Sequence, residues 1–154
     1  MHVIVATDGS RASLVAARQF QWIADSREIT DVTVVAVVSP YAAVPFANDL
    51  GPQEPAPLTE LNFVREARAA VDIVAAEFEG WGPRIHKEIR SGSPAQEIIR
   101  AAEDVDADLI SLASGSRGLT RTILLGSTAS RVQHSAPCPV LVCRPTPNSE
   151  RALG

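Results

Sequence analysis

The chain has 154 residues, the usual length of one domain with a sizeable core. Its formal net charge is −4 and Lys87 is its only lysine, so it lacks the clustered positive charge of nucleic-acid-binding and membrane-surface proteins. It contains no apolar run of transmembrane length, and its first residues lack the basic start and cleavage pattern of a signal peptide, so we expect neither feature.

Apolar runs rich in β-branched residues alternate with helical periodicity in the first part of the chain. Residues 2–7 (HVIVAT) and 31–38 (DVTVVAVV) have the pattern of strands that are buried on both faces of a parallel sheet. Residues 11–25, between these strands, are predicted to form a helix that Ser10 caps at its N-terminus. The buried face of this helix is predicted to contain Ala16, Phe20, Ile23 and Ala24.

A proline-rich connection separates the second predicted strand from the second predicted helix. Residues 39–57 contain five prolines, so this segment is not helical, and it is longer than most connections in α/β proteins. Such connections are lids over a site or are disordered, and the sequence leaves the choice open. Helical periodicity returns in residues 58–79. The core stripe of this helix is predicted to consist of Ala67, Val71, Val74 and Phe78.

The alternation of strands and helices continues in the second half. Residues 84–90 (RIHKEIR) have the pattern of a strand, and their charges are typical of an exposed sheet edge. Residues 95–103 are predicted to form a helix, with Pro94 at its first position and Ser93 as its cap. Residues 108–113 (DLISLA) are predicted to form another buried strand.

The stretch 113–142 is the one around which we expect the site to be organised. It contains the end of a buried strand, a loop rich in glycine and hydroxyl residues, a helix that opens with Gly126, Ser127 and Thr128, and a last apolar strand. Small residues let the backbone approach a ligand closely, and a helix start presents free N–H groups and the positive end of the helix dipole. The stretch therefore predicts an anion site.

These elements alternate as βαβαβαβαβ, with five strands and four helices. Helical crossovers predict an open α/β fold, in which a mainly parallel sheet has right-handed connections and helices on both faces. We expect a single domain over residues 1–145 and a flexible tail over residues 146–154.

Three predicted strand ends carry small or polar residues. Ligands of open parallel sheets bind beyond the carboxyl ends of the strands, where the strand order reverses. If the first and fourth strands are neighbours there, the Asp8 carboxylate can accept hydrogen bonds from sugar hydroxyls in the crevice that the glycine loop lines. The backbone at Val37 can pair with the edge of a base. The alternative interpretation of residues 8–10 is a turn followed by a helix cap.

Several catalytic motifs are absent from the sequence. It contains no G-x-x-x-x-G-K-[ST], no G-x-G-x-x-G after the first strand, and no G-x-S-x-G nucleophile elbow. His134 and Cys138 are separated by a proline, and two ligands do not make a zinc site. Because no general acid–base pair is evident either, we expect no metal centre and no dedicated enzyme.

Five short motifs follow one another along the chain. They are residues 3–10 (VIVATDGS), 92–98 (GSPAQEI), 107–110 (ADLI), 124–132 (LLGSTASRV) and 136–142 (APCPVLV). As a set in this order they resemble the universal stress protein family, with a similarity that extends from residue 3 to about residue 144. The resemblance implies a Rossmann-like sheet of order 3-2-1-4-5 and, as in many members, a site for ATP or AMP, with or without Mg²⁺.

The resemblance also implies which residues contact the nucleotide. Ala6, Thr7, Asp8 and Val37 would surround the adenine and ribose, and Ala6 stands where many members have proline. Gly126, Ser127 and Thr128 would bind the phosphates.

The glycine loop aligns with the family pattern in two ways. Nucleotide-binding members resemble G-x-x-G, then nine residues, then G-[ST]. Gly115 and Gly118 match the glycine pair, but only seven residues separate them from Gly126. Counting back nine residues from Gly126 instead puts Ala113 and Ser116 at the two glycine positions. Both pairs, together with Ser114, are therefore candidates for contacts with the phosphates.

Residues 139–144 (PVLVCR) form the other predicted edge strand, and its apolar character favours pairing with another chain. Family members commonly dimerise through this strand, so we predict a homodimer centred on Val140, Leu141 and Val142.

The predicted function is that of a dimeric stress-response or signalling module that binds ATP or AMP, with slow hydrolysis at most and with unidentified protein partners. The alternative is a scaffold of the same fold without a nucleotide. The two cysteines of the chain are predicted to be reduced, and the protein is therefore expected in the cytoplasm.

Overall fold

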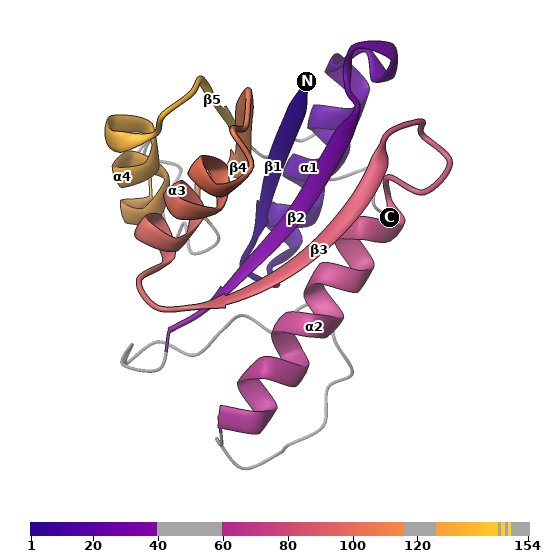
Figure 1. The fold of residues 1–154 in the computed structure, drawn as a ribbon. Helices are drawn as coiled ribbons and strands as arrows, with labels where there is room; N and C mark the ends of the chain where they lie inside the picture. Colours follow the sequence, from indigo (N-terminus) through magenta and orange to yellow (C-terminus); the bar gives the residue numbers. More distant parts are fainter. Residues whose placement is uncertain (40–59, 116–125, 145, 147, 149–154) are drawn as a thin grey trace.

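The protein is a doubly wound α/β domain, described by a computed structural model for residues 1–39, 60–115, 126–144, 146 and 148 (Figure 1). Its sheet has five parallel strands in the order β3-β2-β1-β4-β5, as expected. The strands are β1 (His2–Thr7), β2 (Asp31–Val38), β3 (Arg84–Ser91), β4 (Leu109–Ala113) and β5 (Val140–Cys143). The helices are α1 (Arg11–Ile23), α2 (Glu60–Ala76), α3 (Pro94–Asp104) and α4 (Ser127–Ser135), with a 3-10 turn at Ser26–Glu28.

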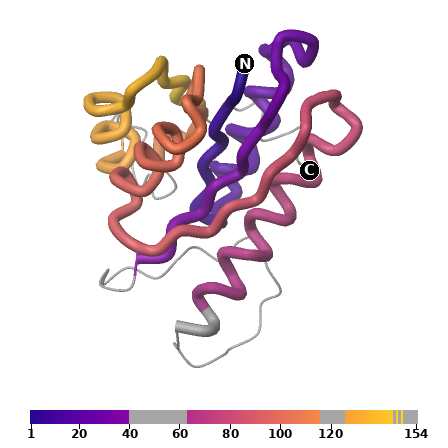
Figure 2. The backbone as a smooth tube through the Cα atoms, viewed as in Figure 1, coloured from indigo at the N-terminus to yellow at the C-terminus, as the bar shows by residue number. Residues whose placement is uncertain are grey.

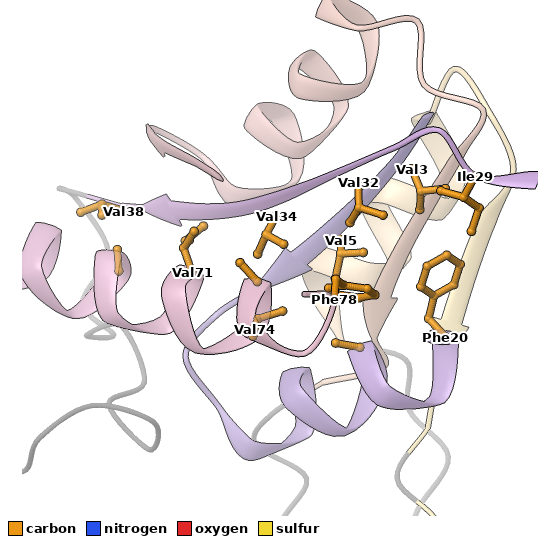
Figure 3. Packing of buried hydrophobic residues seen from close by; sticks show 14 residues of the cluster. Val3, Val5, Phe20, Ile29, Val32, Val34, Val38, Val71, Val74 and Phe78 are labelled. Atoms are coloured by element: carbon orange, nitrogen blue, oxygen red, sulfur yellow. The ribbon is translucent and has the colours of Figure 1, made fainter. Parts of the chain in front are cut away.

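The helices form one layer on each face of the sheet. α1 and α2 pack on one face, where they enclose Val32 and Val34 of β2 (Figure 3). α3 and α4 pack on the other face, against Val35 and Val37 of the same strand. Neighbouring residues of a strand point to opposite faces, so a strand covered on both sides is apolar at nearly every position. This double burial explains the unbroken apolar runs of β1 and β2.

α1 begins where Ser10 was expected to cap it. The Ser10 hydroxyl accepts a hydrogen bond from the Ser13 backbone N–H at 3.1 Å. Phe20 is fully buried, but Ile23 is 59% exposed, so its assignment to the buried face was wrong. Ile23 lies about 60° around the helix axis from Phe20 and therefore on the flank of the last turn. Phe20 and the partly buried Ala24 form the contact with the core instead.

α2 runs along β2 and β3, as the backbone trace shows (Figure 2). Its predicted stripe is confirmed, since Ala67, Val71, Val74 and Phe78 are all buried. The helix ends at Ala76, three residues before the predicted end, and Phe78 lies in the turn that follows. Of the proline-rich connection at 39–57, all but Ser39 lies outside the described residues.

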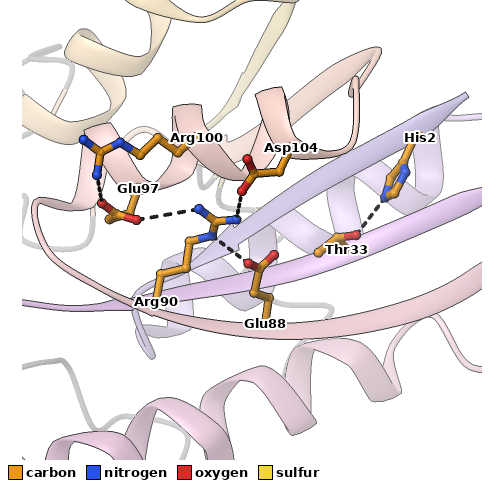
Figure 4. A network of polar contacts seen from close by, with 7 residues as sticks. All are labelled: His2, Thr33, Glu88, Arg90, Glu97, Arg100 and Asp104. Atoms are coloured by element: carbon orange, nitrogen blue, oxygen red, sulfur yellow. Dashed lines mark hydrogen bonds and ion pairs between the residues drawn. The ribbon is translucent and has the colours of Figure 1, made fainter.

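β3 is an edge strand, and an ion-pair network ties it to α3 (Figure 4). Arg90 Nε donates to Glu88 Oε1 at 2.7 Å, and the same guanidinium contacts Asp104 and Glu97 on α3. Pro94 occupies the first turn of α3 as expected. Ser93 stands at the cap position, but its side chain makes no capping hydrogen bond. The prediction for Ser93 was therefore correct in position and wrong in mechanism.

His2 begins β1 inside a small polar cluster. Its Nε2 lies 2.7 Å from Thr33 Oγ1 (Figure 4). Its ring centroid lies 5.9 Å from that of His86. His86 in turn lies 2.8 Å from an Asp31 oxygen. Burial lowers the pKa of His2 below its usual value; His86 and the N-terminal amine act in the same direction, while Asp31 and Asp108 act against it. His2 is consequently neutral over a wider pH range in the folded protein than in the unfolded chain.

We expect this histidine to make stability pH-dependent. An unfolded histidine takes up a proton near pH 6.5, before the folded His2 does, so stability falls as the pH drops below about 6.5. Urea unfolding between about pH 7 and pH 5 should show a smaller loss for His2→Gln than for the wild type. His134→Gln removes a histidine at an exposed position outside this cluster and is the matched substitution for comparison. A wild-type slope in His2→Gln would contradict the assignment.

Candidate functional site

The turn after β1 holds the Asp8 carboxylate in a fixed position. Asp8 Oδ1 accepts hydrogen bonds from the Ser10 backbone N–H at 3.0 Å and from the Ser10 hydroxyl. The same hydroxyl caps α1 at Ser13, so the turn-and-cap interpretation of residues 8–10 is confirmed. Asp8 Oδ2 makes no hydrogen bond within the described part of the chain. Within the described residues, the carboxylate therefore has one oxygen engaged by the turn and one that makes no hydrogen bond.

Thr7 and Ala6, the last two residues of β1, precede this turn and are both buried. Thr7 is buried, its Oγ1 lies 2.8 Å from Ser13 Oγ, and it accepts a hydrogen bond from the Gly9 N–H at 3.2 Å. Ala6 packs in the core on the α3 and α4 side of the sheet. The side chains of these two predicted site residues therefore make contacts within the protein itself. Among the described residues of this turn, the polar atom without such a contact is Asp8 Oδ2.

The order in which successive strands are added to the sheet reverses between β1 and β4. Pairing between these two strands ends at Val5↔Ser111, whereas β1 remains paired with β2 as far as Thr7↔Ala36. β4 remains paired with β5 as far as Ala113↔Cys143. The carboxyl ends of β1 and β4 are therefore unpaired with each other at the point where the strand order reverses. This is the position at which open α/β sheets bind ligands.

A backbone junction joins the two ends of the glycine loop at this position. Gly126 donates its N–H to the Ser114 carbonyl oxygen at 2.6 Å, and Ser114 donates its own N–H to the Cys143 carbonyl at 2.9 Å. A side chain at Gly126 would put its Cβ 2.8 Å from the Ser114 oxygen and 3.3 Å from Gly115 Cα. Only glycine fits at 126, so the sequence at this position preserves the close approach of the two segments.

α4 begins at this junction. Gly126 is its N-cap residue and supplies no side-chain capping bond, so the first N–H groups of the helix have no partner from a cap side chain. The helix dipole adds positive potential at the same end. Ser127 and Thr128 lie in this first turn, so both predicted phosphate residues stand at a helix start, the kind of position that favours an anion.

The remaining predicted residues divide into placed and undescribed ones. Val37 lies one position beyond the last β1–β2 pair, with its side chain buried on the α3 side. Ala113 ends β4, and Gly115 follows it with φ +154°, a value that favours glycine. Ser116 and Gly118 lie outside the described residues. Both alignments of the loop therefore remain open.

Sequence reasoning missed the part that Ser13 plays in the site. Ser13 Oγ bonds to Thr7 Oγ1 and donates to the Ser10 carbonyl at 2.8 Å, so it links the turn to α1. The signal was present as a serine three positions after the cap residue, on the buried face of the helix. The described residues contain no group of three or more His, Cys, Asp or Glu side chains arranged to bind a metal ion. Within the same residues, no helix has the length and apolar character needed to cross a membrane.

The sheet order and the reversal of strand order between β1 and β4 define a doubly wound α/β protein. The model of the universal stress protein family matches residues 1–144, and the chain belongs to this family. It is 40% identical to universal stress protein MJ0531 of Methanocaldococcus jannaschii, over 92% of this chain and 81% of that protein. Universal stress protein Rv2624c of Mycobacterium tuberculosis is 31% identical over 92% of this chain, which spans about half (47%) of that relative.

Solved structures share the fold. Universal stress protein UspA from Lactobacillus plantarum superposes with a TM-score of 0.71 at 26% identity, covering 94% of this chain and 97% of that one. A family member from Arabidopsis thaliana, solved with AMP bound, superposes with a TM-score of 0.62 at 17% identity, over 96% and 94% of the two chains. A universal stress protein solved in complex with cAMP gives 0.62 at 20% identity, over 93% and 96%.

Proposed function

We propose that this chain is a stress-response protein that binds ATP or AMP at the switch point between β1 and β4. The observation that carries the proposal is the junction of Ser114 and Gly126, which brings the start of α4 to the carboxyl end of the sheet. The turn that fixes Asp8 ends the neighbouring strand. Proteins of the same fold solved with AMP and with cAMP support the choice of an adenine nucleotide.

Each group of the site has a chemical counterpart in such a ligand. Asp8 Oδ2 accepts hydrogen bonds from ribose hydroxyls, while Oδ1 stays with Ser10. The free N–H groups at the start of α4, with the hydroxyls of Ser127 and Thr128, bind phosphate oxygens, and Mg²⁺ shares the phosphate charge where it is present. The backbone at Val37 pairs with the base. Together these contacts recognise sugar, phosphate and base separately.

The proposed activity is binding, with hydrolysis that is slow or absent. Fast phosphoryl transfer requires a positioned base and cationic groups around the transferred phosphate. Asp8 is hydrogen-bonded to Ser10 and has no basic side chain as a partner in the described part of the chain. A carboxylate fixed in this way suits recognition of hydroxyl groups better than proton transfer to a bound water.

The protein is proposed to act as a homodimer through β5, and to transmit its nucleotide state to partner proteins. β5 is an edge strand, so one side of its backbone lacks a neighbouring strand of the same sheet. Val140, Leu141 and Val142 are only partly buried. The opposite edge, β3, carries charged side chains that oppose pairing. A cytoplasmic location is proposed from the sequence expectation that Cys138 and Cys143 are reduced.

The nucleotide proposal is tested by titration calorimetry of purified, nucleotide-free protein with ATP and AMP, with and without Mg²⁺. We expect Asp8→Ala to weaken binding by about tenfold to a hundredfold, because a hydrogen bond to a charged group contributes about 1.5–3 kcal/mol. Asp8→Asn keeps a side-chain oxygen for the turn and removes the charge, so it should have a smaller effect.

Thermal melting of the same variants separates damage to the turn from loss of a ligand contact. Ser10→Ala removes the cap of α1 together with the hydroxyl that donates to Asp8 Oδ1, while the carboxylate itself is retained. Its melting temperature therefore reports the cost of damage to the turn and cap without loss of the proposed ligand group. Unchanged affinity in Asp8→Ala would contradict the role of Asp8. Absence of binding at millimolar ATP and AMP would overturn the nucleotide proposal and favour the scaffold alternative.

A further inference from the structure

The largest exposed apolar side chains of the described residues include two neighbours on α1. Trp22 is 87% exposed and Ile23 is 59% exposed. Arg18 and Gln21 of the same helix bind Glu77 beside α2, so they define the flank of α1 that faces α2. Ile23 lies on the opposite flank, as the helical repeat requires, and Trp22 points away from the sheet between the two flanks. An exposed tryptophan beside an isoleucine is typical of a surface that a partner covers.

This flank of α1 lies over the free edge of the sheet. α1 packs on β4 and β5, and Gln19 Nε2 donates to the Arg144 carbonyl, immediately after β5, at 2.9 Å. α1 runs antiparallel to the strands, so Ile23 lies one turn, about 6 Å, further toward the start of β5. That distance corresponds to two strand residues, which brings Ile23 level with Val142. Leu141 packs on the same face of the sheet and is only partly buried.

The symmetry of a dimer paired through β5 determines which element of the second copy lies beside this flank of α1. Antiparallel pairing of two copies of β5 creates a two-fold axis perpendicular to the sheet, and such an axis keeps α1 of both copies on the same face. α1 lies over β4, which is one and a half strand spacings, about 7 Å, from the axis. The two α1 helices are then antiparallel neighbours about 14 Å apart.

A separation of about 14 Å exceeds the 8–10 Å of direct helix contact, so only large side chains bridge it. Trp22 and Ile23 are such side chains, and they lie at the level of the proposed axis. We infer that Trp22 and Ile23 form a second, helical contact of the dimer, in which α1 of one copy packs against α1 of a second copy across the axis. The inference rests on the proposed dimer through β5 and adds the helix layer to it.

Fluorescence of Trp22 reports this contact directly. The chain has two tryptophans, and Trp81→Phe leaves Trp22 as the only one while keeping a ring against Phe20 and Phe78. We expect blue-shifted emission and weak acrylamide quenching in the dimer. Both should change to the values of an exposed tryptophan on dilution, in step with dissociation measured by analytical ultracentrifugation.

Substitutions then measure the energetic part of the contact. Trp22→Ser should weaken the dimer on the order of tenfold or more, because a central tryptophan is a typical interface hot spot. Val64→Ser is the matched control, since Val64 is 40% exposed on α2 and lies outside the proposed contact. It should leave dimerisation unchanged.

Two results would overturn the inference in distinguishable ways. A stable dimer in which Trp22 stays exposed, and which Trp22→Ser does not weaken, would leave the β5 dimer intact and exclude the α1 contact. A protein that is monomeric at every concentration would refute the β5 dimer, and the α1 contact with it. Calorimetry of nucleotide binding on the same samples tests the ligand proposal independently of both results.

Discussion

Phe78→Ala is expected to lower the free energy of unfolding by about 3–5 kcal/mol. Phe78 is fully buried, and its ring lies 6.2 Å from that of Phe20 and 5.6 Å from that of Trp81. The cluster joins the turn after α2 to α1, so truncation leaves a cavity between the two helices that cover one face of the sheet. Domains of this length are stable by about 5–15 kcal/mol, so the loss removes a large part of the total.

Urea and thermal unfolding of the variant measure this effect. For a chain of this size we expect a fall in Tm of roughly 10 °C. Val64→Ala is the control, because Val64 is partly exposed and its truncation leaves no buried cavity. A loss below about 1 kcal/mol would mean that the surrounding side chains collapse into the space, and that the aromatic cluster is not rigid.

The strands were predictable because burial on both faces leaves a strong local signal. The apolar run at 31–38 coincides with β2, whose neighbouring residues Val34 and Val35 belong to the two opposite cores. The stripe from Ala67 to Phe78 was predictable because burial leaves a local signal in a helix too. Only one face of α2 meets the sheet, so its apolar residues recur with the helical period. The strand order came from the family resemblance, because nothing in the local pattern of a strand names its neighbour.

The features that the sequence did not predict depend on contacts between distant segments. The exposure of Ile23 follows from where α1 meets the edge of the sheet, which periodicity within the helix does not specify. Ser93 has the residue type of a cap, yet α3 begins without its side chain. The end of β1–β4 pairing at Val5↔Ser111 is likewise a property of the assembled sheet. At the site, the sequence predicted the position of Asp8 but not that Ser10 holds one of its oxygens.

Gly126 illustrates the same limit, because the reason for its glycine lies twelve residues away along the chain, at Ser114. The two residues meet through a 2.6 Å hydrogen bond, and a Cβ at 126 would approach the Ser114 oxygen to 2.8 Å. That oxygen belongs to the backbone and is held by the neighbouring pairing of Ser114 with Cys143, so it has little freedom to move away.

We expect Gly126→Ala to weaken binding of ATP about a hundredfold, and Gly126→Val to abolish it. The added carbon separates α4 from the end of β4, so the several N–H groups that bind phosphate move together. Each hydrogen bond to a charged ligand contributes about 1.5–3 kcal/mol to the binding free energy. Gly80→Ala is a matched control: Gly80 has φ +74° with no atom near an added Cβ, so this variant should lose stability through backbone strain while its affinity for ATP stays the same. Titration calorimetry and thermal melting of both variants give the comparison. An alanine at 126 that binds ATP within threefold of the wild type would show that the junction of α4 and β4 does not hold the phosphates.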